Sequence, residues 1–407
     1  KIKMSGTIII GAGQAGSAAA AKLRNLGYEG DITLIGAETA PPYQRPPLSK
    51  KYMLGEMELE RLYLRPIDFY ETNNIILRLG TKVDAIDTTQ RSISVQGETL
   101  SYDNLILTTG SWPRRLPGKI GGDLAGVYSM RDLADADAMA DEFQEGRRTL
   151  IIGGGYIGLE AAAVAAKKGV NVTLVEMADR ILQRVAAPQT SDYFRAAHTA
   201  QGVDIREGVG LDHLIECDGR VGAAKLSDGS KIEIDFAIVG VGILPASELA
   251  EAAGITEENG IKVDEFGCTS APNVYAAGDC ASLPYKGERI RLESVQNAID
   301  QAENVAANIM GQDVPYVPMP WFWSDQYDIK LQIAGLNRGY DAVYERRDAD
   351  SDAQSIWYYQ GDTLLAVDAI NDSRAYMVGK RLIEMGKSPT PQEAMDPATN
   401  LKALLKK

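Results

Sequence analysis

The sequence is poor in the residues that many catalytic and metal sites require. It has two histidines, His198 and His213, and three scattered cysteines, Cys217, Cys268 and Cys280, with no C-x-x-C pair. A histidine-rich metal centre is therefore excluded, a serine–histidine hydrolase nearly so, and we expect no bound metal. Scattered cysteines also favour a reducing compartment, so we expect a cytoplasmic protein.

The sequence also lacks a positive net charge and a long apolar run. Its 407 residues include 42 Lys and Arg against 56 Asp and Glu, a net charge of −14 at pH 7. This balance argues against general nucleic-acid binding, which needs a basic surface. No stretch reaches the roughly 18 apolar residues of a membrane span, so we expect no membrane insertion. The length allows two or three domains.

What the sequence does contain is the same glycine turn twice. TIIIGAGQAG starts at Thr7, and TLIIGGGYIG starts at Thr149. Each is a short apolar run, typical of a buried parallel strand, followed by G-x-G-x-x-G. The first glycine permits a tight turn, the second lets the backbone approach a pyrophosphate, and the third lets a helix pack on the strand. Two copies in matched settings predict two bound dinucleotides.

The first copy predicts a strand over 7–10, a helix over 18–26 that stops at Gly27, and a second strand over 32–35. A pyrophosphate would bind at the N-terminus of the helix, where free N–H groups and the helix dipole favour negative charge. The acidic residue that should hold a ribose hydroxyl is not obvious, because Glu38 lies slightly beyond the end of the strand. A glycine turn without a ligand stays open as an alternative.

The second copy predicts a helix that runs to Lys168 and a strand over 172–175 that ends on Glu176. A carboxylate at this position, about 20 residues after the first glycine, accepts hydrogen bonds from an adenosine ribose. Glu176 would repel a 2′-phosphate, and Met177 and Ala178 follow it where an arginine would suit that phosphate. NADH is therefore favoured over NADPH.

Two further stretches have the same character. LILTTG, Leu105–Gly110, is an apolar strand ending in small residues, and NVYAAGDCA, Asn273–Ala281, is a strand ending in Gly278 and Asp279. The Asp279 carboxylate is suited to the ribityl hydroxyls of a flavin, although Gly-Asp also occurs in ordinary turns.

In this order the motifs resemble the FAD-dependent pyridine nucleotide-disulfide oxidoreductase superfamily, and within it the NADH-dependent ferredoxin reductases of the putidaredoxin reductase type. The resemblance covers essentially the whole chain. Its most specific pieces are RPPLSK (Arg45–Lys50), GGGYIGLE (Gly153–Glu160), GDCA, RLESVQNA (Arg291–Ala298) and PWFWSDQ (Pro320–Gln326).

The resemblance implies an α/β fold with two Rossmann-like dinucleotide-binding domains of the glutathione-reductase type and a small α+β C-terminal domain. It places the FAD-binding domain at 1–114 and 245–318, the NAD-binding domain at 115–244 and the C-terminal domain at 319–407. For that last domain the residue pattern predicts a hairpin of strands over 355–360 and 363–369 and a helix over 372–385.

The resemblance also implies the residues that contact each dinucleotide. For FAD these are Gly11, Gly13, Ala15, Gly16, Arg45, Lys50, Val83, Arg131, Gly278, Asp279 and Val295. For NADH they are Gly153, Gly155, Tyr156, Ile157, Gly158, Glu160, Glu176, Arg184 and Gly242. Family members often have an acidic residue where this chain has Ala37, so either the Ala37 backbone or Glu38 serves the FAD ribose.

What the chain lacks selects the branch of the superfamily. Disulfide reductases have a redox cysteine pair, and the peroxidases and oxidases have one cysteine in the loop occupied here by Pro41–Gln44. Without a thiol relay, electrons must leave the flavin directly. The expected activity is that of a ferredoxin–NAD(+) reductase: a hydride passes from NADH to FAD, and two single electrons pass to a [2Fe–2S] ferredoxin that feeds a monooxygenase or a dioxygenase.

Three residues are candidates for the chemistry itself. Lys50 is expected near flavin N5, paired with Glu160, and Trp321 is expected to pack on the isoalloxazine. The alternatives are a surface lysine on a proline-rich loop and a tryptophan that serves the core. Two other functions remain open: a flavin reductase for rubredoxin or another acceptor, and a redox-sensing FAD/NAD-binding protein. The sequence does not indicate an oligomeric state.

Overall fold

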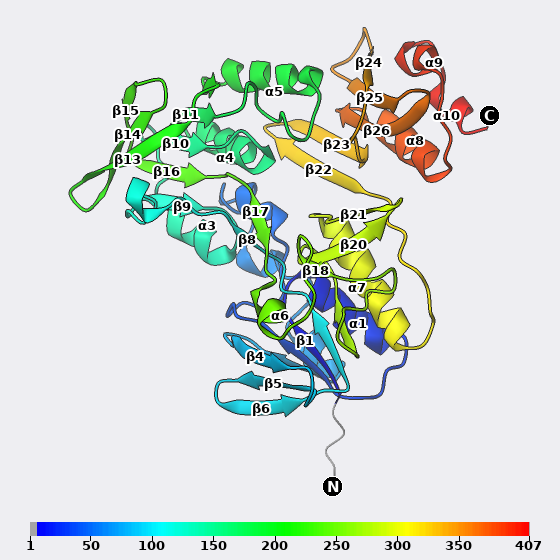
Figure 1. Ribbon diagram of the computed structural model, residues 1–407. Coiled ribbons are helices and arrows are strands. Elements are labelled where there is room, and N and C mark those ends of the chain that lie inside the picture. Colours follow the sequence, from blue (N-terminus) through cyan, green and yellow to red (C-terminus); the bar gives the residue numbers. More distant parts are fainter. Residues whose placement is uncertain (1–5, 407) are drawn as a thin grey trace. The chain divides into compact units, whose positions relative to one another are not determined.

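The computed structural model describes residues 6–406, which form two compact units (Figure 1). The first contains the chain up to Gln44, Leu59–Trp112 and Ile243–Pro318. The second contains Arg45–Glu58, Pro113–Gly242 and the chain from Met319. None of the helices within residues 6–406 combines the length and the apolar character needed to cross a bilayer.

The first unit is organised around a five-stranded parallel sheet with β1 at its centre. Its order is β19-β7-β1-β2-β3, and Thr7 of β1 pairs with Ile32 of β2 and Asn104 of β7. The strands are β1 (Thr7–Ile10), β2 (Ile32–Ile35), β3 (Ile75–Arg78), β7 (Asn104–Leu107) and β19 (Val274–Ala276). The two strands predicted for the first glycine turn are therefore confirmed.

Two helices, α1 (Gln14–Asn25) and α7 (Val295–Ile309), lie side by side against this sheet (Figure 1). Their buried faces share one hydrophobic core with the strands, in which Ala19, Leu23 and Ala302 are fully buried. The expected onset of α1 at Ala18 is wrong, because the helix begins directly after Gly13 of the turn. The small alanines of α1 allow this close packing.

The rest of the first unit consists of smaller elements around this core. One antiparallel sheet contains β4 (Val83–Asp87), β5 (Ser92–Val95) and β6 (Glu98–Ser101), and another small sheet contains β18 (Ile261–Lys262), β20 (Ala281–Tyr285) and β21 (Glu288–Ile290). Two short helices, α2 (Asp68–Thr72) and α6 (Glu248–Ala252), complete it. A short pair of strands, β8 (Ser111–Pro113) and β17 (Ile243–Pro245), lies where the chain passes between the two units.

The second unit repeats the parallel sheet, in the order β12-β11-β10-β16-β9. Thr149 of β10 pairs in parallel with Val172 of β11 and Phe236 of β16, so the second glycine turn has the same setting as the first. The strands are β9 (Val127–Ser129), β10 (Arg148–Ile152), β11 (Asn171–Glu176), β12 (Asp204–Glu207) and β16 (Phe236–Val239). The helices are α3 (Leu133–Ala140), α4 (Tyr156–Lys167) and α5 (Pro188–Ala200).

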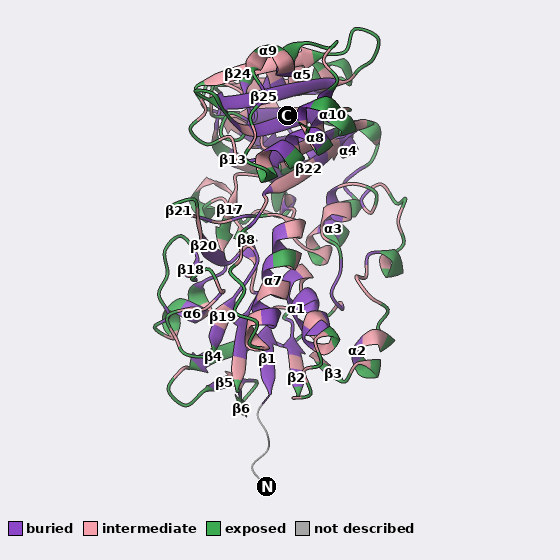
Figure 2. Cartoon of the chain, turned by 90° about the vertical axis from the view of Figure 1, so that its right-hand side faces the viewer, coloured by how far each residue is buried: buried purple, intermediate pink, exposed green. Residues whose placement is uncertain are grey.

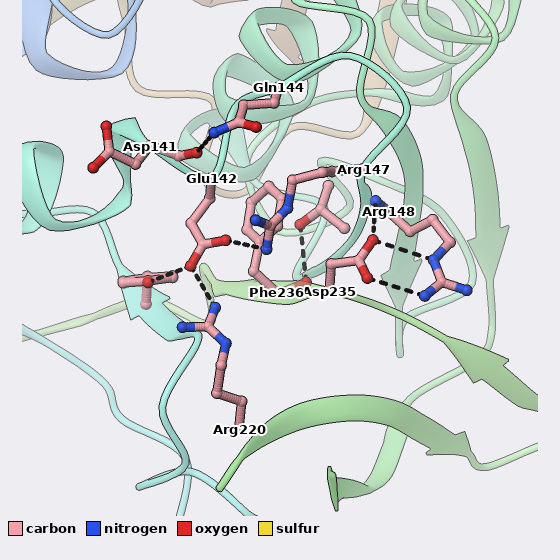
Figure 3. Close-up of polar contacts among 10 residues, drawn as sticks. Asp141, Glu142, Gln144, Arg147, Arg148, Arg220, Asp235 and Phe236 are labelled. Atoms are coloured by element: carbon pink, nitrogen blue, oxygen red, sulfur yellow. Dashed lines mark hydrogen bonds and ion pairs between the residues drawn. The ribbon is translucent and has the colours of Figure 1, made fainter. Parts of the chain in front are cut away.

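A polar cluster holds the end of this second sheet opposite the glycine turn (Figure 3). The guanidinium of Arg148 binds both carboxylate oxygens of Asp235, which ties β10 to the start of β16. The buried carboxylate of Glu142 pairs with Arg147 and Arg220. A three-stranded antiparallel sheet, β13 (Leu211–Cys217), β14 (Arg220–Leu226) and β15 (Lys231–Glu233), is thereby connected to the parallel one.

The C-terminal part of the second unit is an antiparallel sheet in the order β22-β23-β26-β25-β24. Residues of β25 and β26 are mostly buried (Figure 2), and α8 packs on them through Ala375, Val378 and Leu382. The elements are β22 (Trp321–Gln326), β23 (Ile329–Gly335), β24 (Ala342–Arg347), β25 (Gln354–Gln360), β26 (Thr363–Ile370), α8 (Ser373–Glu384), α9 (Pro391–Met395) and α10 (Leu401–Leu404). The predicted hairpin and helix are confirmed.

A buried carboxylate connects this C-terminal sheet to α5. Asp368 of β26 is fully buried, and one of its oxygens accepts hydrogen bonds from the hydroxyls of Thr190 (2.7 Å) and Tyr358 (2.5 Å). Its other oxygen has no hydrogen-bond partner among the described residues. Burial outweighs the two hydroxyl donors and raises the pKa of Asp368 to about 6.

This pKa predicts a pH dependence of stability that Asp368→Asn removes. An aspartate in the unfolded chain has a pKa of about 3.9, so between about pH 4 and pH 6 the folded state binds more protons than the unfolded state. The free energy of unfolding therefore falls as pH rises through this window, by roughly 3 kcal/mol for two pKa units. Urea unfolding of wild type and variant across the window measures the difference. Asp362→Asn, at the exposed hairpin turn, is the control and should keep the wild-type slope of unfolding free energy against pH. If Asp368→Asn also kept that slope, the prediction would be contradicted.

Candidate functional site

Both glycine turns fold as the motif requires. In the first, Gly11 has a φ of +114°, and a Cβ added there would lie 2.0 Å from the carbonyl oxygen of Thr108. A Cβ on Gly16 would lie 2.0 Å from the carbonyl oxygen of Gly11, so a side chain fits at neither position. The Cβ position of Gly13, by contrast, has no atom within 4 Å. This open position is where the motif lets a ligand approach the backbone.

The second turn repeats this pattern of two closed glycines and one open one. Gly153 has a φ of +111°, and its Cβ would lie 2.1 Å from the carbonyl oxygen of Gly240. A Cβ on Gly158 would lie 2.1 Å from the carbonyl oxygen of Gly153, whereas the Cβ position of Gly155 is open. The two turns therefore offer the same kind of approach, one in each unit.

The helix that follows each turn starts without a side-chain cap. Gly13 is the N-cap of α1 and Gly155 that of α4, and neither helix has an acidic residue in its first turn. The first N–H groups of both helices thus keep their hydrogen-bonding capacity and their partial positive charge for an anion. A pyrophosphate is the group that this arrangement suits in a dinucleotide-binding fold.

The structure brings Asp279 to the first turn. A Cβ on Gly278 would lie 3.2 Å from the Cβ of Ala15, so the Gly278–Asp279 stretch borders the start of α1. The Asp279 carboxylate accepts a hydrogen bond from the hydroxyl of Ser111 (2.9 Å), and Gly278 N–H donates to the side chain of Gln301 on α7. Val295, another expected contact, is the first residue of α7.

The carboxylate of Glu176 is oriented by the backbone of the second turn. Its two oxygens accept hydrogen bonds from the N–H groups of Gly154 and Ala178, each at 2.8 Å. Each carboxylate oxygen has a second lone pair, so the side chain keeps acceptor capacity for a ribose hydroxyl. The negative charge of Glu176 is thus held against Gly154, the residue before the open Gly155.

The first turn has no equivalent acid. Ala37 is exposed, and Glu38 is half-buried with a carboxylate oxygen 2.5 Å from the hydroxyl of Tyr43, which donates to it. This tyrosine holds the Glu38 side chain in place. Whether the Ala37 backbone or the Glu38 carboxylate serves a ribose stays a prediction.

Two other residues expected to contact NADH lie close together. Gly242 has a φ of +101°, and a guanidinium nitrogen of Arg184 lies 3.9 Å from its Cβ position. At the start of α4, Ile157 is exposed, whereas the hydroxyl oxygen of Tyr156 is buried without a hydrogen-bond partner among the described residues. The ring of Tyr156 packs against Phe322 of β22 at 5.0 Å between centroids. Burial raises the pKa of Tyr156 well above its ordinary value.

The residues expected to contact FAD do not all belong to the first unit. Val83 is buried at the start of β4 in the first unit, whereas Arg45, Lys50 and Arg131 belong to the second. Arg45 donates a hydrogen bond to the carbonyl oxygen of Arg131 at 3.1 Å. These two expected contacts are therefore neighbours within the second unit.

The predicted pairing of Lys50 with Glu160 is present. The Lys50 ammonium lies 3.4 Å from a carboxylate oxygen of Glu160 and 3.6 Å from one of Asp325. It also lies 5.8 Å from the centre of the Trp323 ring. Lys50 is therefore not a freely solvated surface lysine, because two carboxylates and an aromatic ring hold its charge in one place.

Glu160 is buried in the middle of α4 with only 4% of its surface exposed. Hydroxyl groups of Ser49 and Ser324 donate to its two oxygens at 2.9 and 2.7 Å. Burial raises the pKa of Glu160, while Lys50 and the two serine hydroxyls oppose that shift. Every one of these partners favours the ionised form over the neutral one.

Trp321 lies on β22 in an aromatic group. Its ring centre is 5.7 Å from that of Trp323 and 6.1 Å from that of Tyr376 on α8, and the Lys380 ammonium lies 5.5 Å from it. Trp321 is only half-buried, so packing in the core does not account for its whole surface.

Three side chains of this site are not among the residues predicted from the sequence. Ser49, Ser324 and Asp325 all contact the Lys50–Glu160 pair. They lie inside RPPLSK and PWFWSDQ, the stretches already singled out, and the polar residues within those apolar motifs were the available signal.

The cysteines do not form a redox centre. All three are free: Cys217 is exposed, Cys268 is half-buried and Cys280 is fully buried. Burial raises the pKa of the Cys280 thiol, which disfavours the reactive thiolate. No group of histidine, cysteine and acidic residues suited to a metal ion occurs within residues 6–406.

Two family models match the sequence of this chain. Residues 6–302 match the family of pyridine nucleotide-disulphide oxidoreductases, and residues 321–405 match the reductase C-terminal family. The first match spans both glycine turns and the Gly278–Asp279 stretch, and the second begins at Trp321.

Individual proteins match along nearly the whole chain. A ferredoxin–NAD(P)(+) reductase of a Sphingomonas species is 45% identical over 93% of this chain and 92% of its own length. Rhodocoxin reductase of Rhodococcus erythropolis is 41% identical over 97% of this chain and 93% of its own. Putidaredoxin reductase of Pseudomonas putida is 39% identical, covering 98% and 96%.

Solved structures agree with these relationships. The putidaredoxin reductase–putidaredoxin covalent complex contains a chain with a TM-score of 0.95 and 39% identity, covering 99% of this chain and 98% of that one. A ferredoxin reductase from Rhodopseudomonas palustris has a TM-score of 0.94 and 38% identity, covering 98% and 99%. The chain described here belongs to the pyridine nucleotide-disulphide oxidoreductase family.

Proposed function

We propose that this protein is an FAD-containing ferredoxin–NAD(+) reductase that passes electrons from NADH to a [2Fe–2S] ferredoxin serving a monooxygenase or a dioxygenase. The observation that carries the proposal is the presence of two glycine turns, each with one open glycine and an uncapped helix, in a chain whose cysteines form no redox pair. The similarity to ferredoxin reductases along nearly the whole chain supports it.

The first unit fits the adenine dinucleotide half of FAD. The open Gly13 and the free N–H groups of α1 suit its pyrophosphate, and the Asp279 carboxylate beside them suits ribityl hydroxyls. Gly11, Ala15, Gly16, Val83, Gly278 and Val295 are the remaining contacts that we propose from this unit, with Ala37 or Glu38 at the ribose. Arg45, Lys50 and Arg131 are FAD contacts that we propose from the resemblance alone.

The second turn fits NADH. Gly155 leaves room for a pyrophosphate, and the oriented Glu176 carboxylate suits the ribose hydroxyls while repelling a 2′-phosphate. The other contacts that we propose are Gly153, Tyr156, Ile157, Gly158, Glu160, Arg184 and Gly242.

Bound FAD would supply the redox chemistry that links two-electron transfer from a nicotinamide to one-electron transfer to an iron–sulfur protein. The chain's part is to position charge: Glu160 and Asp325 hold the Lys50 ammonium, which we propose steadies the negative charge of the reduced ring. Trp321, half-buried on β22, is the aromatic surface that we propose for packing on that ring.

The finer assignments of domains and location are proposals as well. We propose an FAD-binding domain at 1–114 and 245–318, an NAD-binding domain at 115–244 and a C-terminal domain at 319–407. A cytoplasmic location is supported by three cysteines that are all free.

The activity is tested by anaerobic stopped-flow mixing with NADH or NADPH, followed by mixing with a [2Fe–2S] ferredoxin. We expect NADH to bleach the flavin faster than NADPH does, and the ferredoxin then to restore the oxidised flavin spectrum. A rubredoxin serves as the competing acceptor. Faster electron transfer to rubredoxin than to any ferredoxin tested would overturn the proposed partner.

The choice of nucleotide is tested by Glu176→Ala. Loss of the carboxylate removes both the ribose acceptor and the repulsion of a 2′-phosphate. The ratio of kcat/KM for NADH to that for NADPH should therefore fall on the order of tenfold or more. The ratio is informative even when the variant is less active overall, and an unchanged ratio would show that Glu176 does not discriminate. Glu207→Ala, at the end of the neighbouring strand β12, is the control for loss of an acidic side chain.

The two kinds of glycine give a second test. Gly155→Ala places a methyl group in open space, so stability should change by no more than about 1 kcal/mol while the dissociation constant for NADH rises. Gly158→Ala forces a methyl group against the carbonyl of Gly153 and should cost roughly 1–3 kcal/mol. Thermal unfolding and NADH titration measure the two effects. Unweakened NADH binding in Gly155→Ala would contradict the proposed pyrophosphate position.

A further inference from the structure

The Lys50–Glu160 pair is the end of a longer chain of hydrogen bonds within the second unit. The hydroxyl of Ser324 donates to Glu160 at 2.7 Å, and the side-chain amide of Gln326 donates to the oxygen of Ser324 at 3.2 Å. The Gln326 carbonyl oxygen lies 2.8 Å from Nε2 of His198. Nδ1 of His198 lies 2.9 Å from the hydroxyl of Tyr327.

The interior of this chain is closed to water. Ser324 and His198 are fully buried, and Gln326 is 1% exposed. A buried polar group without a hydrogen bond costs about 1–3 kcal/mol, so these side chains depend on one another for their partners. A leucine or an alanine in such a buried position would not require a hydrogen-bond partner, whereas each of these three side chains does.

The alternation of β22 explains how the chain forms. Ser324 and Gln326 are two residues apart on one strand and therefore point to the same face of the sheet. They lie between Glu160 of α4 and His198 of α5. Three segments that are distant in the sequence, α4, α5 and β22, are joined by this one face.

The donors of the chain all point the same way. An ionised Glu160 only accepts hydrogen bonds, so the Ser324 hydroxyl must donate to Glu160 while its oxygen accepts from the Gln326 amide. The Gln326 oxygen then requires a proton on Nε2 of His198, and Nδ1 accepts from Tyr327. The geometry thus selects the neutral Nε2–H tautomer of His198. Burial lowers the pKa of His198, which agrees with a neutral ring.

We propose that His198 and Gln326 are positioning residues for the proposed reductase reaction, because they orient Ser324 and so hold the Glu160 carboxylate, and with it the Lys50 ammonium, in one geometry. The proposal rests on the proposed function for its catalytic meaning. Its structural half, a chain of donors directed at Glu160, does not depend on any cofactor. His198 and Gln326 touch neither Lys50 nor a reacting group; they act through Ser324 and Glu160.

The structural half is tested by NMR of the protein labelled with ¹⁵N-histidine. The protein has two histidines, and the exposed His213 is the internal control. At alkaline pH we expect His198 to show the Nε2–H tautomer alone, and to remain neutral at the pH, near about 6.5, where an ordinary histidine is half protonated. A dominant Nδ1–H tautomer, or an imidazolium at neutral pH, would overturn the proposed direction of the chain.

The coupling to Glu160 is tested with the same spectrum. In Glu160→Gln the acceptor charge is gone, so the direction of the donors is no longer imposed and the ¹⁵N shifts of His198 should change across three hydrogen bonds. Glu142→Gln removes another buried carboxylate, one that does not belong to this chain of hydrogen bonds, and is the matched control. Identical His198 shifts in wild type and Glu160→Gln would show that the two residues are not coupled.

The catalytic half is tested with Ser324→Ala and His198→Ala in the holoenzyme. We expect the limiting rate of flavin reduction at saturating NADH to fall on the order of tenfold, as for loss of a hydrogen bond to a charged group, with the dissociation constant for NADH unchanged. Ser355→Ala removes another fully buried serine of the same sheet and should leave the rate unchanged.

A double variant separates positioning from general damage. If His198 acts through Glu160, His198→Ala should slow Glu160→Gln no further. If the two substitutions lowered the rate of flavin reduction independently, so that their fold-losses multiplied in the double variant, the positioning role would be overturned. NMR shifts as expected with no flavin reduction by NADH in the wild type would instead leave the hydrogen-bond chain standing and refute the reductase function.

Discussion

The burial of one carboxylate determines how the second unit is put together. Glu160 lies in the middle of α4 with almost no exposed surface, and a buried charge is tolerated only when it is paired and fully hydrogen-bonded. Its partners come from outside the helix: Lys50 and Ser49 from the segment Arg45–Glu58, and Ser324 from β22. The charge thereby requires these segments to meet α4 in one arrangement. An apolar residue at this position would require none of these partners, so the carboxylate specifies an arrangement that an apolar residue would leave open.

The two parallel sheets carry the same glycine motif. Both turns close two glycines against a carbonyl oxygen and leave the middle one open, so both can receive a pyrophosphate. They differ at the end of the second strand, where backbone N–H groups orient Glu176 in one unit and exposed Ala37 stands in the other. The oriented Glu176 therefore gives the second turn a preorganised acceptor at a position where the first turn has Ala37.

The parts of the molecule that were predictable from sequence are those that a local pattern specifies. The glycine turns, their strands and the position of Glu176 all lie within one strand–helix–strand unit, so spacing alone reveals them. The Lys50–Glu160 pair was accessible only through resemblance to a family. Ser49 and Ser324 lie in stretches that the sequence singles out, but the partners of these serines and of His198 could not be predicted. Each bond joins distant positions: Ser49 and Glu160 are 111 residues apart, Ser324 and Glu160 are 164 apart, and His198 and Gln326 are 128 apart. The helix α1 starts earlier than predicted because Gly13, which belongs to the turn, is also the N-cap of the helix.

The order of strands in the first sheet has a consequence for how the chain is made. β1 is its central strand, but the edge strand β19, which pairs with β7, begins only at Val274, after the whole of the second parallel sheet. During synthesis the second sheet is therefore complete while the first still lacks its edge strand β19 and the helix α7 that packs on it. The first sheet, although its first strands are synthesised earliest, must therefore finish folding after the second. Until then its apolar strands are exposed to chaperones and to non-native contacts.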